Sequence, residues 1–459
     1  MEAIIYQNLK AEGAPINRIL NLEIKNELNA YGSAYIEGEA DYEQAQEYIQ
    51  RVQPGTQITI STTAKGQPPK LFAGVISNIS MRKEDEYAVL QIKLEAMASQ
   101  LNVEKQNRSF QKSSSTYEEV INMAVGGKGI VDMKASDHPI GSLIMQYNET
   151  PWIFAMRMAS ALGAPICSNI NTEVPILTIG IPDTGKSYDL KDVEYGYSSD
   201  GGSTGTTLTG MQTVQIGDRV MYGGKRDAVK KYCCRMQGGI LMTTVYVIPE
   251  AEAQSINSGN GTAGENVPNQ IMNTQAAGKM FTGIVQEVNL DKVKVHLTDI
   301  DSSFDGGGDF WFPYSTAYSS GDGSGFYCMP AQGDTVRVFF PSDNEKDAFA
   351  ASSINVSPLA DPKHKKWRTP GGKEILMTEQ GMFITCKQDR IFINLEDENG
   401  ITIFSEKDIN VNSMSNMTLY AREGIAIHSE SKILVSTGES YIDITSELIQ
   451  MGAQQILIN

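Results

Sequence analysis

The sequence predicts a mainly β protein with one small helical insertion and a repetitive β segment near its C-terminal end. Short runs of alternating apolar residues, separated by turns with Gly, Pro or Asn, fill much of the first 250 residues. Two segments in the middle of this region carry helix-capping signals. From residue 393 onward, apolar residues recur at an eight-residue step. The length of 459 residues suffices for about three domains.

Two β-barrels are predicted in the first half of the chain. Residues 1–112 contain five or six short strand patterns, such as "LFAGVISNIS" and "EYAVLQIKLEAM", and this density is typical of a small barrel or sandwich. Strand patterns resume in residues 166–250 and end with "GGILMTTVYVIP". We therefore expect a second barrel there.

The predicted helical insertion covers residues 113–165. Thr116 and Glu119 have the spacing of a capping box, in which each side chain accepts a hydrogen bond from the other residue's backbone. Thr150 before Pro151 marks the start of a second helix, since proline is favoured at the first helical position.

The second half of the chain divides into four predicted segments. Residues 251–278 are rich in Ser, Asn, Gly, Ala and Gln, which predicts a linker. Residues 279–355 hold five strand patterns and predict a barrel of the oligonucleotide/oligosaccharide-binding (OB) type. Residues 356–372 form a basic collar linker, and residues 373–459 carry the octad repeat.

Each octad of the repeat places two apolar residues two positions apart, on the same face of a short strand. Polar residues and glycines between them predict the turns. The register slips by one residue before Ile442. The predicted inward residues are Ile401, Ile403, Ile409, Val411, Met417, Leu419, Ile425, Ile427, Ile433, Val435, Ile442, Ile444, Ile449 and Met451.

One chain has no other element to cover this apolar face. The inward side chains alone offset only part of the backbone entropy that ordering the repeat costs. Three identical chains wound around one axis would bury the face as a common core and would pair the strand edges with their neighbours. The sequence therefore predicts a homotrimeric, intertwined triple-stranded β-helix. A single-chain β-solenoid stays open as the alternative.

Composition argues against several classes of partner and location. The net charge of −17 disfavours nucleic acid as a partner. The chain start lacks the pattern of a signal peptide, and no run of 18 apolar residues occurs, so we expect synthesis in the cytoplasm without a signal peptide. Five scattered cysteines without paired spacing fit a reducing compartment.

No enzyme chemistry is predicted. The histidines are His138, His296, His364 and His428, and they lie in different segments without a catalytic partner pattern. We therefore predict no catalytic residue and no cofactor.

Two further motifs have a simple structural interpretation. Asp299, Asp301, Asp305 and Asp309 could hold calcium, but they lack the EF-hand spacing, so a solvated loop and no metal is the expectation. The basic run "KHKKWR" at residues 363–368 could contact a single nucleic-acid strand. Because it lies beside an acidic repeat, pairing with acids of a neighbouring subunit is the favoured interpretation.

The order of these parts resembles the hub–spike proteins of contractile injection systems, which include type VI valine–glycine-repeat (VgrG) spikes and the hub and needle proteins of contractile phage tails and tailocins. Three stretches carry the likeness: "MQYNETPWIFAMRMASALGAPI"; "LFAGVISNIS" with "LNVEKQNRSFQ"; and "WFPYSTAYSSGDGSGFYCMPAQGDTVRVFFP". Their order is more specific than any one of them. The octad glycine typical of the family is mostly absent here.

The resemblance implies a structural homotrimer whose barrels form a hub ring of six, which adapts a three-fold spike to a six-fold tube. The implied partners are inner-tube or tube-initiator proteins, baseplate wedge proteins and a PAAR-like tip protein at the needle end. It further implies assembly into a contractile, tail-like particle that is delivered outside the cell and punctures an envelope. The alternatives are a trimeric β-prism adhesin or tail fibre that binds surface glycans, and a cell-wall hydrolase with a β-stalk.

Overall fold

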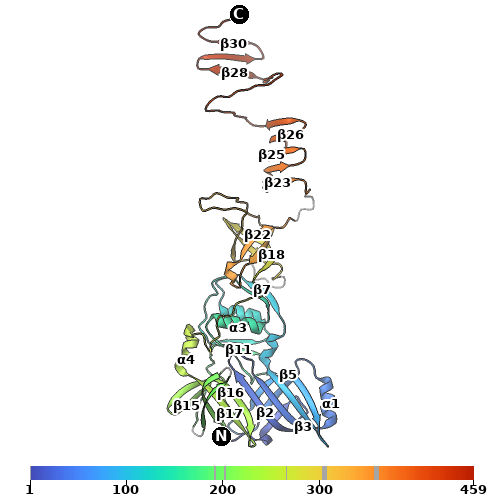
Figure 1. The fold of residues 1–459 in the computed structure, drawn as a ribbon, viewed down its shortest axis with the longest axis vertical. Coiled ribbons are helices and arrows are strands. Elements are labelled where there is room, and N and C mark those ends of the chain that lie inside the picture. The colour runs from blue at the N-terminus through green and yellow to red at the C-terminus, as the bar shows by residue number, and fades with distance from the viewer. Residues whose placement is uncertain are drawn as a thin grey trace. The chain divides into compact units, whose positions relative to one another are not determined.

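The computed structural model describes residues 2–190, 193–200, 203–264, 266–301, 308–355 and 361–458. The chain divides into two compact units, Met1–Asn355 and Val356–Asn459 (Figure 1). With 44% of residues in strands and 12% in helices, the predicted mainly β fold class is confirmed. No helix in the described ranges is long and apolar enough to cross a membrane.

A twelve-stranded sheet dominates the N-terminal unit. Ten strands follow the order β1-β4-β5-β6-β3-β2-β16-β17-β14-β13, while β15 pairs with β16 and β12. The strands are β1 (Leu9–Glu12), β2 (Arg18–Glu27), β3 (Ser33–Ala40), β4 (Gln57–Thr62), β5 (Lys70–Lys83), β6 (Ala88–Ala96), β12 (Ser187–Asp189), β13 (Glu194–Asp200), β14 (Ser203–Gly210), β15 (Arg219–Tyr222), β16 (Lys225–Gln237) and β17 (Ile240–Pro249).

The two barrel segments expected at residues 1–112 and 166–250 share this one sheet. Strands β2 and β16 pair antiparallel, with Ile24 opposite Cys234. One apolar core draws on both halves, since it includes Ile24 and Val245. The sheet is continuous because each half offers a strand edge whose backbone groups need partners.

The helical region carries α2 (Tyr117–Val125) and α3 (Pro151–Ala161). The predicted capping box of Thr116 and Glu119 is confirmed, and so is the Thr150 cap, which accepts a hydrogen bond from the backbone of Ile153. Two small sheets accompany these helices. They are formed by β7 (Gln106–Phe110) with β9 (Ile144–Glu149), and by β10 (Ile166–Ser168), β11 (Ile176–Ile179) and β8 (Ile130–Met133).

The segment 251–278, expected to be a linker, packs against the rest of the unit. It contains all of α4 (Glu250–Ser255) except the first residue of that helix. It also contains the π-helix η3 (Ile256–Asn260). Ala253, Ile256 and Val267 are buried in the core around α2 and α3. A few apolar residues in a polar stretch are enough to bind the segment to a preformed surface.

Five strands form the sheet of the region 279–355, in the order β20-β19-β18-β21-β22. They are β18 (Lys279–Asn289), β19 (Lys292–His296), β20 (Trp311–Pro313), β21 (Thr335–Phe340) and β22 (Phe349–Ser353). A bridge between Tyr314 and Ala350 brings the two edges of the sheet together around a separate core. The OB-type topology itself stays a prediction.

The remaining short helices in the described ranges lie in the N-terminal unit. They are α1 (Tyr42–Arg51), η1 (Tyr6–Asn8), η2 (Met97–Asn102) and η4 (Glu345–Asp347).

The C-terminal unit contains two antiparallel sheets, in the orders β23-β24-β25-β26-β27 and β28-β29-β30. Their strands are β23 (Lys365–Arg368), β24 (Glu374–Met377), β25 (Gly381–Lys387), β26 (Ile391–Glu396), β27 (Gly400–Ser405), β28 (Lys432–Thr437), β29 (Ser440–Thr445) and β30 (Ile449–Gly452). The expected linker 356–372 therefore includes strand β23. Residues 356–360 lie outside the described residues.

Candidate functional site: the apolar repeat face and a buried joint

The octad residues of the C-terminal unit lie opposite one another across its sheets. In the first sheet Ile393 pairs with Ile403, and Leu395 pairs with Ile401. Because directly opposed residues point to the same side of a sheet, these four side chains share one face.

The second sheet has the same arrangement over three strands. Ile433 lies opposite Ile444, which lies opposite Ile449. Val435 and Ile442 are likewise opposed, as are Ile442 and Met451. The slip of one residue in the repeat therefore keeps the apolar side chains on a common face.

This apolar repeat face, made of the fourteen predicted inward residues, is open in the single chain. Ile401 is 71% exposed and Leu419 is 70% exposed, and only Ile433 and Ile444 are partly covered. Not one described residue of 361–458 is buried. Contiguous exposed apolar surface of this extent is typical of a surface that another protein covers.

Three octads in the middle of the repeat form no ladder at all within the chain. They hold Ile409 with Val411, Met417 with Leu419, and Ile425 with Ile427, and no described residue between 408 and 431 belongs to a strand. A few side chains make local hydrogen bonds there. For example, Ser413 Oγ donates to the carbonyl of Asn416. The backbone of this stretch is thus open to pairing with another chain.

The trimer prediction has each octad strand hydrogen-bonded to strands of neighbouring subunits. The remaining octads instead pair within their own chain. Strands β24 to β27 and β28 to β30 pair with strands of their own chain. Tight turns cause this folding back. Gly400 (φ 78°) and Gly438 (φ 53°) adopt the left-handed conformation that such hairpin turns require.

The basic collar pairs with acids of its own chain. Lys363 Nζ lies 3.1 Å from Glu379, and Arg368 Nη1 lies 3.6 Å from Glu374. Both cations are more than half exposed, so each pair contributes little to stability. Pairing of the collar with a neighbouring subunit stays a prediction.

The described aspartates of this segment differ in exposure: Asp301 is buried, whereas Asp299 and Asp309 are exposed. Asp299 accepts a hydrogen bond from the backbone of Thr282 at 2.7 Å. Asp301 is buried and accepts two from Ser109, through its backbone N–H and its hydroxyl, each at 2.6 Å. Asp305 lies outside the described residues, and no group of three potential metal ligands occurs among those that are described.

Three thiols, those of Cys167, Cys233 and Cys234, do not have the features of catalytic nucleophiles. All five cysteines are free. Burial raises the pKa of Cys167 to about 12 and that of Cys234 to about 12, so both stay protonated at neutral pH. Cys233, next to Cys234 on β16, also has a raised pKa because of burial.

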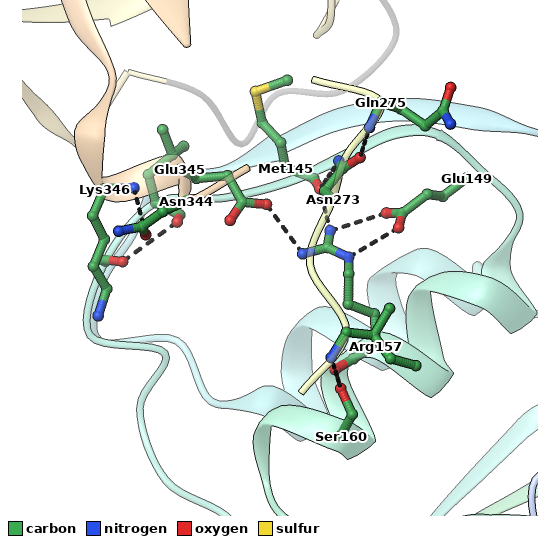
Figure 2. Close-up of polar contacts among 12 residues, drawn as sticks. Met145, Glu149, Arg157, Ser160, Asn273, Gln275, Asn344, Glu345 and Lys346 are labelled. Atoms are coloured by element: carbon green, nitrogen blue, oxygen red, sulfur yellow. Dashed lines mark hydrogen bonds and ion pairs between the residues drawn. The ribbon is translucent and has the colours of Figure 1, made fainter. Parts of the chain in front are cut away.

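A buried joint, which sequence reasoning missed, links α3 to the region 279–355. Arg157 is 3% exposed. Its Nε and Nη2 each lie 2.9 Å from a carboxylate oxygen of Glu149, and its Nη1 lies 3.0 Å from Glu345 in η4 (Figure 2). Nη2 also donates to the carbonyl of Met145. The one signal of this joint in the sequence is Arg157 itself, a charged residue within the apolar run "WIFAMRMASA".

The second half of this joint is the contact of Asp301 with Ser109. Next to it, Gln111 donates to the carbonyl of Val295 at 3.0 Å and accepts from the backbone of Phe310 at 3.2 Å. Burial raises the pKa of Asp301 and of Glu149, and Arg157 opposes the shift at Glu149. Both contacts join segments far apart in the sequence within one unit, and so they fix the position of the region 279–355 on α3 and β7.

The model of the family described as Alg8 N-terminal domain matches residues 2–198. None of the curated proteins matches the chain.

Among solved structures, the Escherichia coli c3393 protein is 15% identical, with a TM-score of 0.51, and the match covers 76% of this chain and 99% of that one. It is described as a component of the type VI secretion system that is structurally similar to the T4 bacteriophage tail proteins gp27 and gp5. This chain has the hub–spike fold. The resemblance expected from the sequence is thereby confirmed at the level of the fold.

A second hub–spike structure matches a larger share of this chain. The half-lidded PdpA–VgrG complex of Francisella matches with a TM-score of 0.51 and 9% identity, over 86% of this chain and 87% of that one. The lidded form of the same complex matches with the same TM-score, 8% identity and 79% coverage of that chain. The VgrG-like fold thus extends well beyond the N-terminal sheet.

Proposed function

We propose that this chain is a structural, non-enzymatic protein that forms the homotrimeric hub and envelope-puncturing spike of a contractile injection machine. In this proposal the N-terminal unit supplies the hub ring, which adapts three-fold symmetry to the six-fold inner tube. Residues 373–459 supply the needle. The hub–spike fold supports this assignment, because it is the fold of a protein described as a component of the type VI secretion system that is structurally similar to phage tail proteins.

The observation that carries the proposal is the open apolar repeat face. The C-terminal unit has ladders and turns, yet no described residue of it is buried. Such a unit gains too little from apolar burial to offset the entropy of ordering its backbone. Copies of the same chain offer the same face at the same axial spacing, so three of them can cover one another.

The mechanism is mechanical. Contraction of a sheath would drive the tube and spike forward, and an interlocked prism would transmit the force without unfolding. The proposed partners are inner-tube or tube-initiator proteins, baseplate wedge proteins and a PAAR-like protein at the needle end. The proposed route is synthesis in the cytoplasm, assembly into the particle and delivery outside the cell.

Light scattering of the purified full chain tests the proposal. The expected mass is three times the chain mass of 50.2 kDa, independent of dilution. A stable monomer in which all helices and strands are formed would contradict the proposal. Zymography on peptidoglycan and glycan-array binding address the rival functions, and neither clearing nor glycan binding by the repeat is expected.

A further inference from the structure

The apolar face of the first C-terminal sheet extends beyond the octad residues towards the start of the unit. In β25, Ile384 lies opposite Ile393 of β26, and Met382 lies opposite Leu395. Directly opposed residues point to the same side of a sheet. Strand β25 therefore continues the face that the octad residues form.

Strands β24 and β23 continue the same pattern. Ile375 and Met377 of β24 lie opposite the two residues of β25, while Trp367 and Lys365 of β23 lie opposite those of β24. Two columns of side chains thus cross all five strands on one side, here called the column face. They are Trp367, Ile375, Ile384, Ile393 and Ile403, and Lys365, Met377, Met382, Leu395 and Ile401.

The opposite face of this sheet is mixed in character. It holds Lys366, Arg368, Glu374, Thr385, Asn394 and Thr402 beside Leu376, Phe383, Phe392 and Phe404. On the column face, by contrast, Lys365 is the one residue of the two columns that is not apolar. An antiparallel sheet commonly packs its apolar face on a core and leaves its more polar face in water.

The column face is nevertheless open in the single chain. Met382 is 42% exposed and Ile384 is 41% exposed. Lys365 does not prevent its burial, because β23 is the edge strand and the Lys365 ammonium donates to the carbonyl of Pro362, just before that strand. A lysine stem can cover apolar surface while its ammonium group stays in water.

Copies of the same chain fit this face. The columns run from β24 to β27 without a polar residue, so the new part is continuous with the octad face assigned to the needle core. Strands in a sheet lie about 4.8 Å apart, and each presents one side chain per column at that step. Identical chains around one axis repeat the same step, so their faces match layer by layer.

We propose that β23, β24 and β25 belong to the common core of the trimer, which then begins at Trp367, within the segment expected to be a linker. This inference rests on the proposed function. The Trp367 side chains of three chains would close the core at its first layer. Force on the needle would then be carried by packed strands from β23 onward.

Light scattering of the full chain carrying Ile384→Asp tests the proposal. The substitution would bring one unpaired charge per chain into the core, so the mass should fall from three chains to one. Asn394→Asp is the matched control. Asn394 lies opposite Phe383 on the other face of the same sheet, and this variant should keep the mass of three chains.

The outcomes separate this inference from the proposed function. A trimeric Ile384→Asp variant would overturn the extended core but leave the trimeric needle in place. Dissociation of both variants would also overturn it, because a charge on either face would then have the same effect. A monomeric wild type would overturn the needle and the extended core together.

Acrylamide quenching of tryptophan fluorescence gives a second measurement if Ile384→Asp does not fold. Trp367→Phe identifies the contribution of Trp367 among the three tryptophans. In the wild-type trimer Trp367 should be quenched less than in the Ile425→Asp, Ile427→Asp double variant, whose trimer should be lost. Equal quenching would show that the core does not include β23.

Discussion

At the scale of single residues, Arg157 is the side chain that joins α3 to the region 279–355 in the N-terminal unit. It is buried, holds Glu149 in a two-pronged contact and reaches Glu345, 188 residues away in sequence. A buried charge that loses its partner is strongly destabilising, whereas an exposed ion pair contributes little.

The substitution Arg157→Met leaves Glu149 and Glu345 as buried carboxylates without their cation. We expect it to lower the free energy of unfolding by about 3–5 kcal/mol. Denaturant unfolding followed by tryptophan fluorescence, to which the buried Trp152 on α3 contributes, measures the change.

Arg235→Met is the control for this experiment. Arg235 pairs with Glu23, but its side chain is 53% exposed, so the expected loss is below about 1 kcal/mol. Equal losses in the two variants would show that the buried joint has no special role.

Asp301 gives the joint a dependence on pH. Burial raises the pKa of Asp301 in the folded state, although hydrogen bonds from Ser109 oppose the shift. The folded protein therefore holds this proton more tightly than the unfolded chain does. The stability from this group is full below the unfolded pKa and is lost as pH rises through the folded pKa.

The variant Asp301→Asn removes this titration. We expect the stability of the wild type relative to the variant to fall as the pH rises from about 4 towards neutrality. Urea unfolding at a series of pH values measures the difference. A constant difference over the whole range would exclude Asp301 as the titrating group.

At the scale of elements, the octad strand is the unit that carries the proposed function. Its two inward residues are spaced so that they share one face, and the register of the sheets keeps successive octads aligned. In the proposed needle, the residue between the two inward residues, such as Ala426 between Ile425 and Ile427, would face the other side of the strand.

Replacement of Ile425 and Ile427 by Asp should abolish the trimer, because each chain would bring two unpaired charges into the common core. The mass from light scattering should fall from three chains to one. Ala426→Asp is the control with a charge on the outward side, and it should stay trimeric. A double variant that remains an SDS-resistant trimer would contradict the assigned core.

At the scale of the whole molecule, the two units differ in how they are stabilised. The three apolar cores of the described chain lie in the N-terminal unit, and their buried residues end at Ala350. Residues 361–458 of the C-terminal unit form strands, but none of them is buried in a core.

The fragment 361–458, expressed alone, should therefore be folded only as an oligomer. Circular dichroism and sedimentation over a dilution series should show strand content and association lost together. The fragment 1–355 serves as the comparison, and it should unfold cooperatively without the repeat. A folded monomeric repeat fragment would refute the trimeric needle.

The sequence by itself determined what depends on local patterns. The capping residues Thr116 and Thr150, the mainly β class and the spacing of the octad pairs all follow from interactions within a few residues. The hub–spike fold was also accessible, because the order of several weak motifs is more specific than any one of them.

Only the tertiary structure decided which distant segments meet. The pairing of β2 with β16, the burial of residues in the expected linker and the contact of Arg157 with Glu345 join positions far apart in the chain. Alternation of polar and apolar residues shows which side of a strand is buried, but it does not identify the partner strand or side chain. That choice depends on the total burial and hydrogen bonding of the folded unit, a property that no single segment carries.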